Sequence, residues 1–145
     1  MQEPIIGIHL DLKYVMPAKK YLMQWVAELA DLGANTLLIE YEDKFPYKKY
    51  PFLSDSEAFT ESQLRQFLDI ARSRGLRIIP FVPTLSHLEH ALRHAPLAHL
   101  RELPHIPTQL DTSNTESIEF VFNLLDDVLA MHEPRSEEHT SELQS

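Results

Sequence analysis

The stretch GANTLLIEYEDKFPY, residues 33–47, decides the fold class of this chain. Its first half is a short apolar run, which predicts a buried strand, and Gly33 before it is the kind of residue that ends a helix. Three carboxylates, Glu40, Glu42 and Asp43, come directly where that strand should end. The stretch therefore predicts a strand whose carboxyl end carries polar groups.

Strand and helix patterns alternate on both sides of this stretch. Short apolar runs bounded by Pro or Gly predict strands, and apolar residues at helical spacing predict helices. A chain of this order requires a parallel sheet, and continuous apolar strands suit a sheet that is covered on both faces. Strands are expected over residues 4–12, 34–42 and 76–83, and helices over residues 17–32, 61–74 and 112–133.

The caps and inward faces of the helices follow from the same pattern. Thr60 is a suitable N-cap for the second helix, and Ser113 or Asn114 for the last one. Apolar residues at helical spacing are expected to face the core. They are Leu22, Trp25, Val26, Leu29 and Leu32 in the first helix, Leu64, Phe67, Leu68 and Ala71 in the second, and Ile118, Val121, Phe122, Leu125 and Leu129 in the last.

Two further features of the C-terminal half are expected to be structural. Residues 84–111 should contain two short helices that are broken at Pro96 and Pro104. Asp126 and Asp127 form an acid pair in the last helix, where their position predicts a solvated face and not a general acid and base.

Two architectures share such a sheet, the doubly wound open sheet and the (β/α)8 barrel. A doubly wound nucleotide-binding domain should carry a glycine-rich turn after its first strand, but none of the 3 glycines follows that strand before the first helix. Polar residues instead follow each strand, at Asp11, at 40–43 and at 84–87. Active sites of barrels are built there. The sequence therefore predicts an α/β fold, the first three β/α units of a TIM barrel with a parallel sheet.

Composition narrows the partners and the location. The 145 residues carry 13 Lys and Arg against 22 Asp and Glu, a formal net charge of −9, which argues against nucleic acid or an anionic membrane as partner. The chain has no cysteine, which excludes a disulfide or a thiolate site. The N-terminus does not resemble a secretory signal, and no apolar stretch approaches the roughly 20 residues that span a bilayer. We expect a soluble cytoplasmic protein.

The last eleven residues, RSEEHTSELQS at 135–145, follow neither helical nor strand periodicity. All of them match one reading frame of a common short-read sequencing adapter, so an artefact is the favoured interpretation and a disordered acidic tail is the alternative. The catalytic-domain sequence is therefore expected within residues 1–134. On this interpretation the natural chain is interrupted at Pro134, where a fourth strand is due.

The residues after the second strand suit a carbohydrate site. Glu40, Glu42 and Asp43 could bond to sugar hydroxyls beside the aromatic rings of Phe45 and Tyr47. The alternative is a solvated loop whose acids pair with the neighbouring lysines Lys44, Lys48 and Lys49.

Further candidates lie at the other two strand ends. Asp11 either orients a substrate or a histidine, or it caps its own loop. His87 is the histidine best placed for hydrogen bonding or proton handling, since it follows the third strand. On a helix, His87, His90 and His94 would share a face, but their spacing matches no known zinc signature, so no metal site is expected.

These motifs, in this order, resemble the catalytic domain of glycoside hydrolase family 20, the β-N-acetylhexosaminidases, and within it the hexosaminidase D-like branch. The resemblance runs from about Ile5 to Pro134 and rests on HLDLKY, GANTLLIEYEDKFPY, IPFVPTLSHLEHAL, LAHLRE and LDTSNTESIEFVFNLLDDVL. It implies a retaining hydrolase that removes terminal N-acetylglucosamine or N-acetylgalactosamine, with the substrate's own acetamide oxygen as nucleophile. It implies no metal and no organic cofactor.

The resemblance also implies roles for single residues. The catalytic Asp-Glu pair belongs at the end of the fourth strand, so it is expected after residue 134 and no catalytic residue is assigned within this chain. His87 matches the histidine of the hydrogen-bond network around those acids, and Asp11 matches the aspartate of the first strand. Glu40 and Asp43 match the acidic strand-end motif that approaches the substrate. Ile6 stands where the broader family has an arginine that grips sugar hydroxyls, and the acidic loop is the candidate to replace that contact.

Two rival hypotheses are a non-catalytic carbohydrate-binding barrel that lost the acids, and a TIM-barrel hydrolase of another family. The coding sequence beyond Pro134 discriminates between them. The chain alone is expected to be inactive and poorly stable, because its third strand would expose an unpaired edge.

Overall fold

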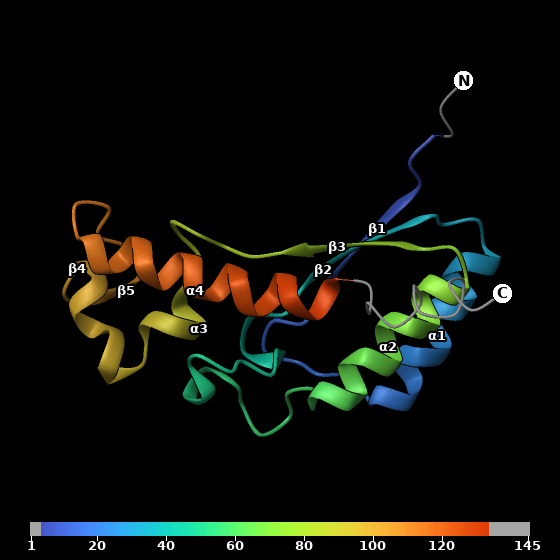
Figure 1. The fold of residues 1–145 in the computed structure, drawn as a ribbon, viewed down its shortest axis with the longest axis horizontal. Helices are drawn as coiled ribbons and strands as arrows, with labels where there is room; N and C mark the ends of the chain where they lie inside the picture. The colour runs from blue at the N-terminus through green and yellow to red at the C-terminus, as the bar shows by residue number, and fades with distance from the viewer. Residues whose placement is uncertain (1–3, 134–145) are drawn as a thin grey trace, which may run out of the picture.

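The structure is a computed structural model that describes residues 4–133, and its centre is a three-stranded parallel sheet (Figure 1). The strands are β1 (Gly7–Asp11), β2 (Thr36–Glu40) and β3 (Arg77–Phe81), in the order β1-β2-β3. Each strand lies within its predicted range, so the predicted parallel sheet is confirmed. The tail at 134–145, with its adapter interpretation, lies outside the described residues.

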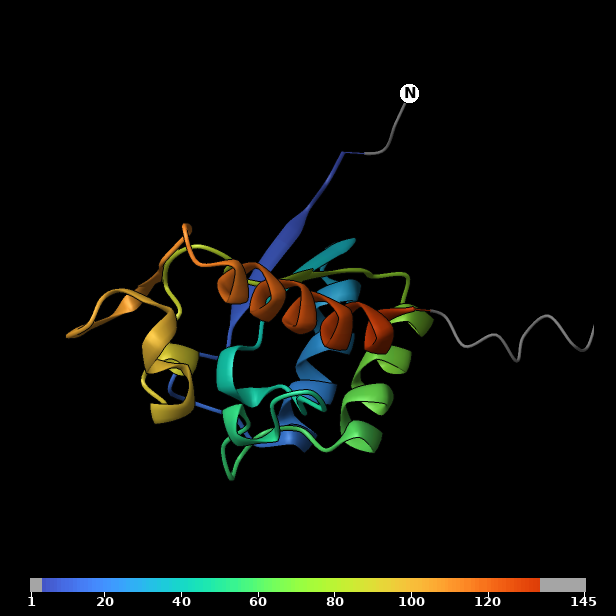
Figure 2. The same ribbon diagram turned by 60° about the vertical axis from the view of Figure 1, so that its left-hand side comes forward.

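Three long helices accompany the sheet, namely α1 (Lys19–Asp31), α2 (Glu61–Ser73) and α4 (Thr115–His132). Figures 1 and 2 show α1 and α2 side by side on one side of the sheet, with α4 running alongside β3. The core lies between the sheet and these helices, where Leu37 and Ile39 of β2 are fully buried. None of the helices within residues 4–133 is long and apolar enough to cross a membrane.

Helix α2 follows the predicted pattern. The backbone N–H of Gln63 donates to Thr60 Oγ1 at 3.2 Å, and the backbone N–H of Thr60 donates to Gln63 Oε1 at 3.0 Å, which completes a capping box. Gly75 follows the helix with a φ of 80°, a left-handed conformation that glycine adopts without strain. The predicted inward residues Leu64, Phe67, Leu68 and Ala71 are all buried.

Helix α1 follows the pattern except at its end. Leu22 and Val26 are buried, and Trp25 packs half-buried against the core, as predicted. The inward prediction for Leu32 is wrong, since this side chain is 84% exposed. The helix ends at Asp31, so helical spacing no longer sets the direction of the next side chain.

The inward face predicted for α4 is wrong at three of its five residues, whereas Val121 packs half-buried against the core as predicted. Asn114 caps the helix by accepting from the backbone N–H of Glu116 at 3.0 Å, as one of the two candidate caps. The predicted inward residues Ile118, Phe122 and Leu129 are exposed. The helix instead buries Phe120, Leu124, Val128 and Met131. Because apolar residues occur on most sides of α4, spacing alone does not select the face that packs inward.

A carboxylate fixes the orientation of α4. Asp127 is 9% exposed, and its Oδ2 accepts hydrogen bonds from the backbone N–H groups of Lys48 and Lys49, both at 2.9 Å. The prediction of a solvated acid pair is therefore wrong for Asp127. Asp126 is exposed and pairs with Lys49 Nζ at 2.7 Å, so the prediction describes this residue correctly.

The segment between β3 and α4 contains the two short helices expected, but it also contains a hairpin. The break predicted at Pro104 is the turn between two antiparallel strands. Its turn residues, Pro104 and His105, are not the Asn-Gly or Asp-Gly type that signals a hairpin in sequence. The elements of this segment are α3 (Glu89–Leu92), the 3₁₀ helix η3 (Ala95–Leu100), β4 (Arg101–Leu103) and β5 (Ile106–Leu110). The loop after β2 contains two further 3₁₀ helices, η1 (Glu42–Lys44) and η2 (Pro51–Leu53).

The candidate site lies on the other face of the sheet, opposite the face that packs against the helices. Asp11, Glu40 and Phe81 occupy one row across the three strands, since Asp11 pairs in register with Glu40 and Glu40 with Phe81. Side chains alternate along a strand, so His9 lies on the same face as Asp11. Phe81 is 43% exposed, which leaves this row accessible within the described part of the chain.

Candidate functional site

A cavity of about 510 Å³ lies at the carboxyl ends of the three strands. Asp11 and Lys13 line it from β1 and the loop that follows, Glu40 from the end of β2, and residues 81–87 from the end of β3 and the segment after it. The cavity therefore brings together three of the four residues that the sequence assigns to substrate binding or support, namely Asp11, Glu40 and His87.

Glu40 is the most buried carboxylate of the cavity wall, with 9% of its surface exposed. Its pKa is raised above the ordinary value, first because burial disfavours the charged form and then because Asp11 repels it. His9 and Lys13 act in the opposite direction, and His9 Nε2 lies 3.3 Å from Glu40 Oε2. Sequence reasoning missed His9, although its place two residues before Asp11 is the signal that could have found it.

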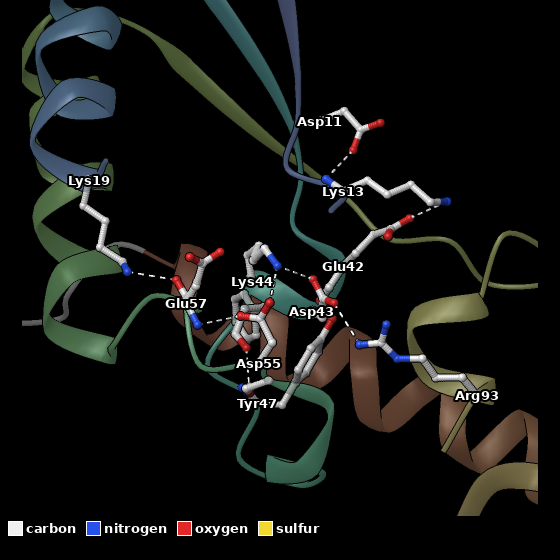
Figure 3. A network of polar contacts seen from close by, with 12 residues as sticks. Asp11, Lys13, Lys19, Glu42, Asp43, Lys44, Tyr47, Asp55, Glu57 and Arg93 are labelled. Carbon is white, nitrogen blue, oxygen red and sulfur yellow. Dashed lines mark hydrogen bonds and ion pairs between the residues drawn. The ribbon is translucent and has the colours of Figure 1, made fainter. Parts of the chain in front are cut away.

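Glu42, which the resemblance does not assign to the site, is linked to the cavity through Lys13. The side chain is 4% exposed, and Oε1 lies 3.0 Å from Lys13 Nζ (Figure 3). Burial raises the pKa of Glu42, and the positive charge of Lys13 opposes that rise. A buried acid and a partly exposed lysine thus join the ends of β1 and β2.

Asp43, the fourth predicted residue, takes part in a separate network. Its Oδ1 lies 3.0 Å from Lys44 Nζ, and its Oδ2 accepts from Arg93 at 2.9 Å (Figure 3). Lys44 is 2% exposed and pairs with Asp55 as well. Asp43 does not contribute to the cavity wall formed by the described residues, so its approach to a substrate stays a prediction. Asp43 pairs with Lys44, as the alternative predicts, but the prediction of a solvated loop is wrong here because both side chains are buried.

A left-handed backbone occurs after each strand of the sheet, at residues that are not glycine. Tyr14 follows β1 with a φ of 63°, Glu42 follows β2 with 47°, and His87 follows β3 with 59°. Such conformations are strained for these residue types and persist where the surroundings fix them, often at functional sites. These three strained residues all follow the strand ends at which the cavity lies.

The histidines after β3 do not form one helical face. Helix α3 begins at Glu89, so His87 precedes it and only His90 lies within it. His90 is 4% exposed, and burial lowers its pKa to about 4, with Asp43 acting in the opposite direction. Residues 4–133 contain no group of three or more His, Asp or Glu side chains placed to hold a metal ion.

The chain is similar to two curated proteins. It is 39% identical to hexosaminidase D of Bos taurus and 40% identical to hexosaminidase D of Homo sapiens, over 126 residues in each case. The similarity covers 86% of this chain, but 36% of the bovine and 26% of the human protein. The chain therefore spans about a third or less of these relatives. No family model matches it.

The fold is similar to that of a solved family 20 enzyme. An exo β-N-acetylglucosaminidase of glycoside hydrolase family 20 from Vibrio harveyi, in complex with N-acetylglucosamine, superposes with a TM-score of 0.72 at 18% identity. The match covers 88% of this chain and 25% of that one. This identity shows the fold alone, a partial α/β barrel. Together with the hexosaminidase D relatives, it confirms the resemblance to a family 20 hexosaminidase.

Proposed function

We propose that this chain, a hexosaminidase-like portion of the family 20 fold, is the N-terminal part of the catalytic barrel of a β-N-acetylhexosaminidase. The enzyme that contains it would remove terminal N-acetylglucosamine or N-acetylgalactosamine from a carbohydrate. One observation carries the proposal: in a chain similar to hexosaminidase D, the cavity joins Asp11, Glu40 and His87 at the carboxyl ends of parallel strands.

The cavity has the chemistry that a pyranose requires. Asp11 and Glu40 offer carboxylate oxygens that accept from sugar hydroxyls, and His87 offers ring nitrogens that donate or accept. Phe81, Val82 and Leu85 supply apolar surface for the carbon face of the ring. We infer that these residues bind and orient the sugar without carrying out the bond cleavage.

The cleavage is assigned to an Asp-Glu pair after residue 134. The acetamide oxygen of the sugar bonds to the anomeric carbon while the glycosidic C–O bond breaks, and the Glu gives a proton to the leaving oxygen. The Asp orients the acetamide. Water then opens the oxazolinium intermediate as the same Glu takes a proton back. Asp11, Glu40 and His87 are proposed to hold the sugar and to support those acids from the carboxyl ends of the first three strands.

The coding sequence beyond Pro134 provides the first test. The proposal requires Asp-Glu at the end of the next predicted strand, and turnover of 4-nitrophenyl N-acetyl-β-glucosaminide or galactosaminide by the full-length protein. Changing that Glu to Gln should lower kcat by about 100-fold or more. A protein that lacks the pair but binds N-acetylglucosamine is the binding barrel, and turnover of other glycosides alone indicates another hydrolase family.

Residues 1–134 expressed alone test the domain assignment. We expect neither hexosaminidase turnover nor a cooperative melt, since β1 and β3 are both edges of the sheet in the described chain. Turnover together with a cooperative melt would overturn this part of the proposal. A cytoplasmic location belongs to the same proposal, and fractionation of cells that express the tagged full-length protein tests it.

A further inference from the structure

We propose that Lys13 is a substrate-binding residue of the cavity, where its ammonium group donates a hydrogen bond to a hydroxyl of the bound sugar. The inference rests on the proposed function for the identity of the ligand. The position of Lys13 rests on the structure itself (Figure 3).

The backbone fixes the start of the Lys13 side chain at the cavity wall. The N–H of Lys13 donates to Asp11 Oδ1 at 2.8 Å, and the N–H of Leu12 donates to the carbonyl oxygen of Glu40 at 3.0 Å. The first of these bonds closes a turn at the end of β1, and the second attaches that turn to the end of β2. Lys13 therefore leaves the sheet between the two carboxylates that line the cavity.

Two carboxylates hold the ammonium group in place. Nζ lies 3.0 Å from Glu42 Oε1, 3.8 Å from Glu89 Oε2 and 5.5 Å from the centre of the Tyr14 ring. Among the described residues, neither of those two carboxylate oxygens has a well-aligned hydrogen-bond donor. An ammonium group has three N–H donors, so this arrangement keeps the charge in place and leaves donors for a ligand.

Two of the three residues around the ammonium group have strained backbone conformations. Glu42 and Tyr14 both have a left-handed backbone, and Glu42 is buried while Tyr14 is 72% exposed at the end of β1. An uncommon backbone conformation on two sides of one lysine indicates that the position of Lys13 is built by its surroundings.

Lys13 completes the hydrogen-bonding chemistry of the cavity. A sugar hydroxyl both donates and accepts, whereas an ionised carboxylate accepts only and an ammonium group donates only. Asp11 and Glu40 can therefore accept hydrogen bonds from the sugar hydroxyls, and Lys13 can donate a hydrogen bond to a hydroxyl oxygen. Of the residues 4–133 that line the cavity, Lys13 is the one Lys or Arg.

The test compares Lys13→Met with the wild type in the full-length protein, using the nitrophenyl N-acetylhexosaminide and its 3-, 4- and 6-deoxy analogues. We expect kcat/KM for the parent substrate to fall by about 10- to 100-fold, as expected for loss of a charge-assisted hydrogen bond. For the analogue that lacks the contacted hydroxyl, wild type and variant should be equal. Lys48→Met is the matched control, because Lys48 is exposed and pairs with Glu61 at 3.0 Å away from the cavity.

A second variant separates binding from folding. Lys13→Met with Glu42→Gln removes the buried charge that the single variant leaves unpaired, and it should melt close to the wild type while retaining the loss on the parent substrate. An equal loss on all four substrates, or no loss in a folded variant, would overturn the role of Lys13. Absence of wild-type turnover would instead overturn the proposed function.

Discussion

Asp127 and Lys49 are 78 positions apart, yet Asp127 Oδ2 accepts a hydrogen bond from the backbone N–H of Lys49 at 2.9 Å. The same oxygen accepts from the backbone N–H of Lys48. One carboxylate of α4 thus binds two backbone donors of the loop after β2. Because this loop also contains Glu42 and Asp43, the contact connects the last helix to the neighbourhood of the cavity.

Changing Asp127 to Ala should destabilise the full-length protein that contains this chain. The substitution leaves two backbone N–H groups without their acceptor at a site with little access to water, at a cost of about 1–3 kcal/mol in the free energy of unfolding. Urea unfolding followed by circular dichroism measures the effect. Asp126→Ala is the control, since Asp126 is exposed, and its effect should stay within about 0.5 kcal/mol. Equal effects would contradict the anchoring role.

Changing Lys44 to Met should lower the free energy of unfolding by more than Asp127→Ala does. Lys44 is 2% exposed between Asp43 and Asp55, so its loss leaves Asp55 without its cation and the buried Asp43 with Arg93 alone. Removing one member of a buried ion-pair network typically costs about 3–5 kcal/mol. The measurement is again the free energy of unfolding. Lys48→Met, which removes an exposed ion pair with Glu61, should cost about 1 kcal/mol or less. A mild effect at Lys44 would show that the network is not required for folding.

His90 should make stability depend on pH. Its pKa falls from 6.5 to about 4 on folding because burial disfavours the charged ring. The unfolded chain therefore binds the proton first, and the contribution of His90 is present above pH 6.5 and lost as pH falls towards 4, by about 3 kcal/mol in total. Unfolding free energies of the full-length wild type and its His90→Gln variant across pH 4–7 measure the difference. Parallel pH profiles would contradict the prediction.

The exposed face of α4 should promote association. Ile118, Phe122 and Leu129 are exposed by 52%, 60% and 52%, which is unusual for large apolar side chains on one helix. In residues 1–134, Phe122→Glu should reduce concentration-dependent association in sedimentation velocity and leave the helical circular dichroism signal unchanged. Phe120→Glu is the matched control, because Phe120 is 1% exposed and a charge there should unfold the chain. Unchanged association in Phe122→Glu would exclude this face.

Local patterns predicted most of the fold, and long-range contacts account for what they missed. The strand positions, the capping box at Thr60 and the buried face of α2 depend on neighbours in sequence, and all agree with the structure. The orientation of α4 depends on Asp127 and on a loop far away in sequence, so helical spacing could not reveal it.

The candidate site could also be predicted only in part from the sequence. Because the carboxyl ends of parallel strands lie at one edge of a sheet, Asp11, Glu40 and His87 were expected to lie close together, and all three line one cavity. Glu42 is linked to the cavity through Lys13, whereas Asp43 belongs to a separate network. Which of the two lies near the cavity depends on the left-handed backbone at Glu42, which turns the chain within two residues of β2. Sequence patterns favour glycine at such a position, so a glutamate there gave no signal.

The register of β2 makes its length as important as its composition. Glu40 lies in one row with Asp11 and Phe81, while Leu37 and Ile39 on the other face are fully buried under the helices. Deleting a single residue from the middle of β2 would reverse the direction of every side chain on one side of the deletion. The carboxylate would then enter the core or the leucine would enter the cavity. Homologous chains should therefore tolerate exchanges among apolar residues in this strand, but neither insertions nor deletions.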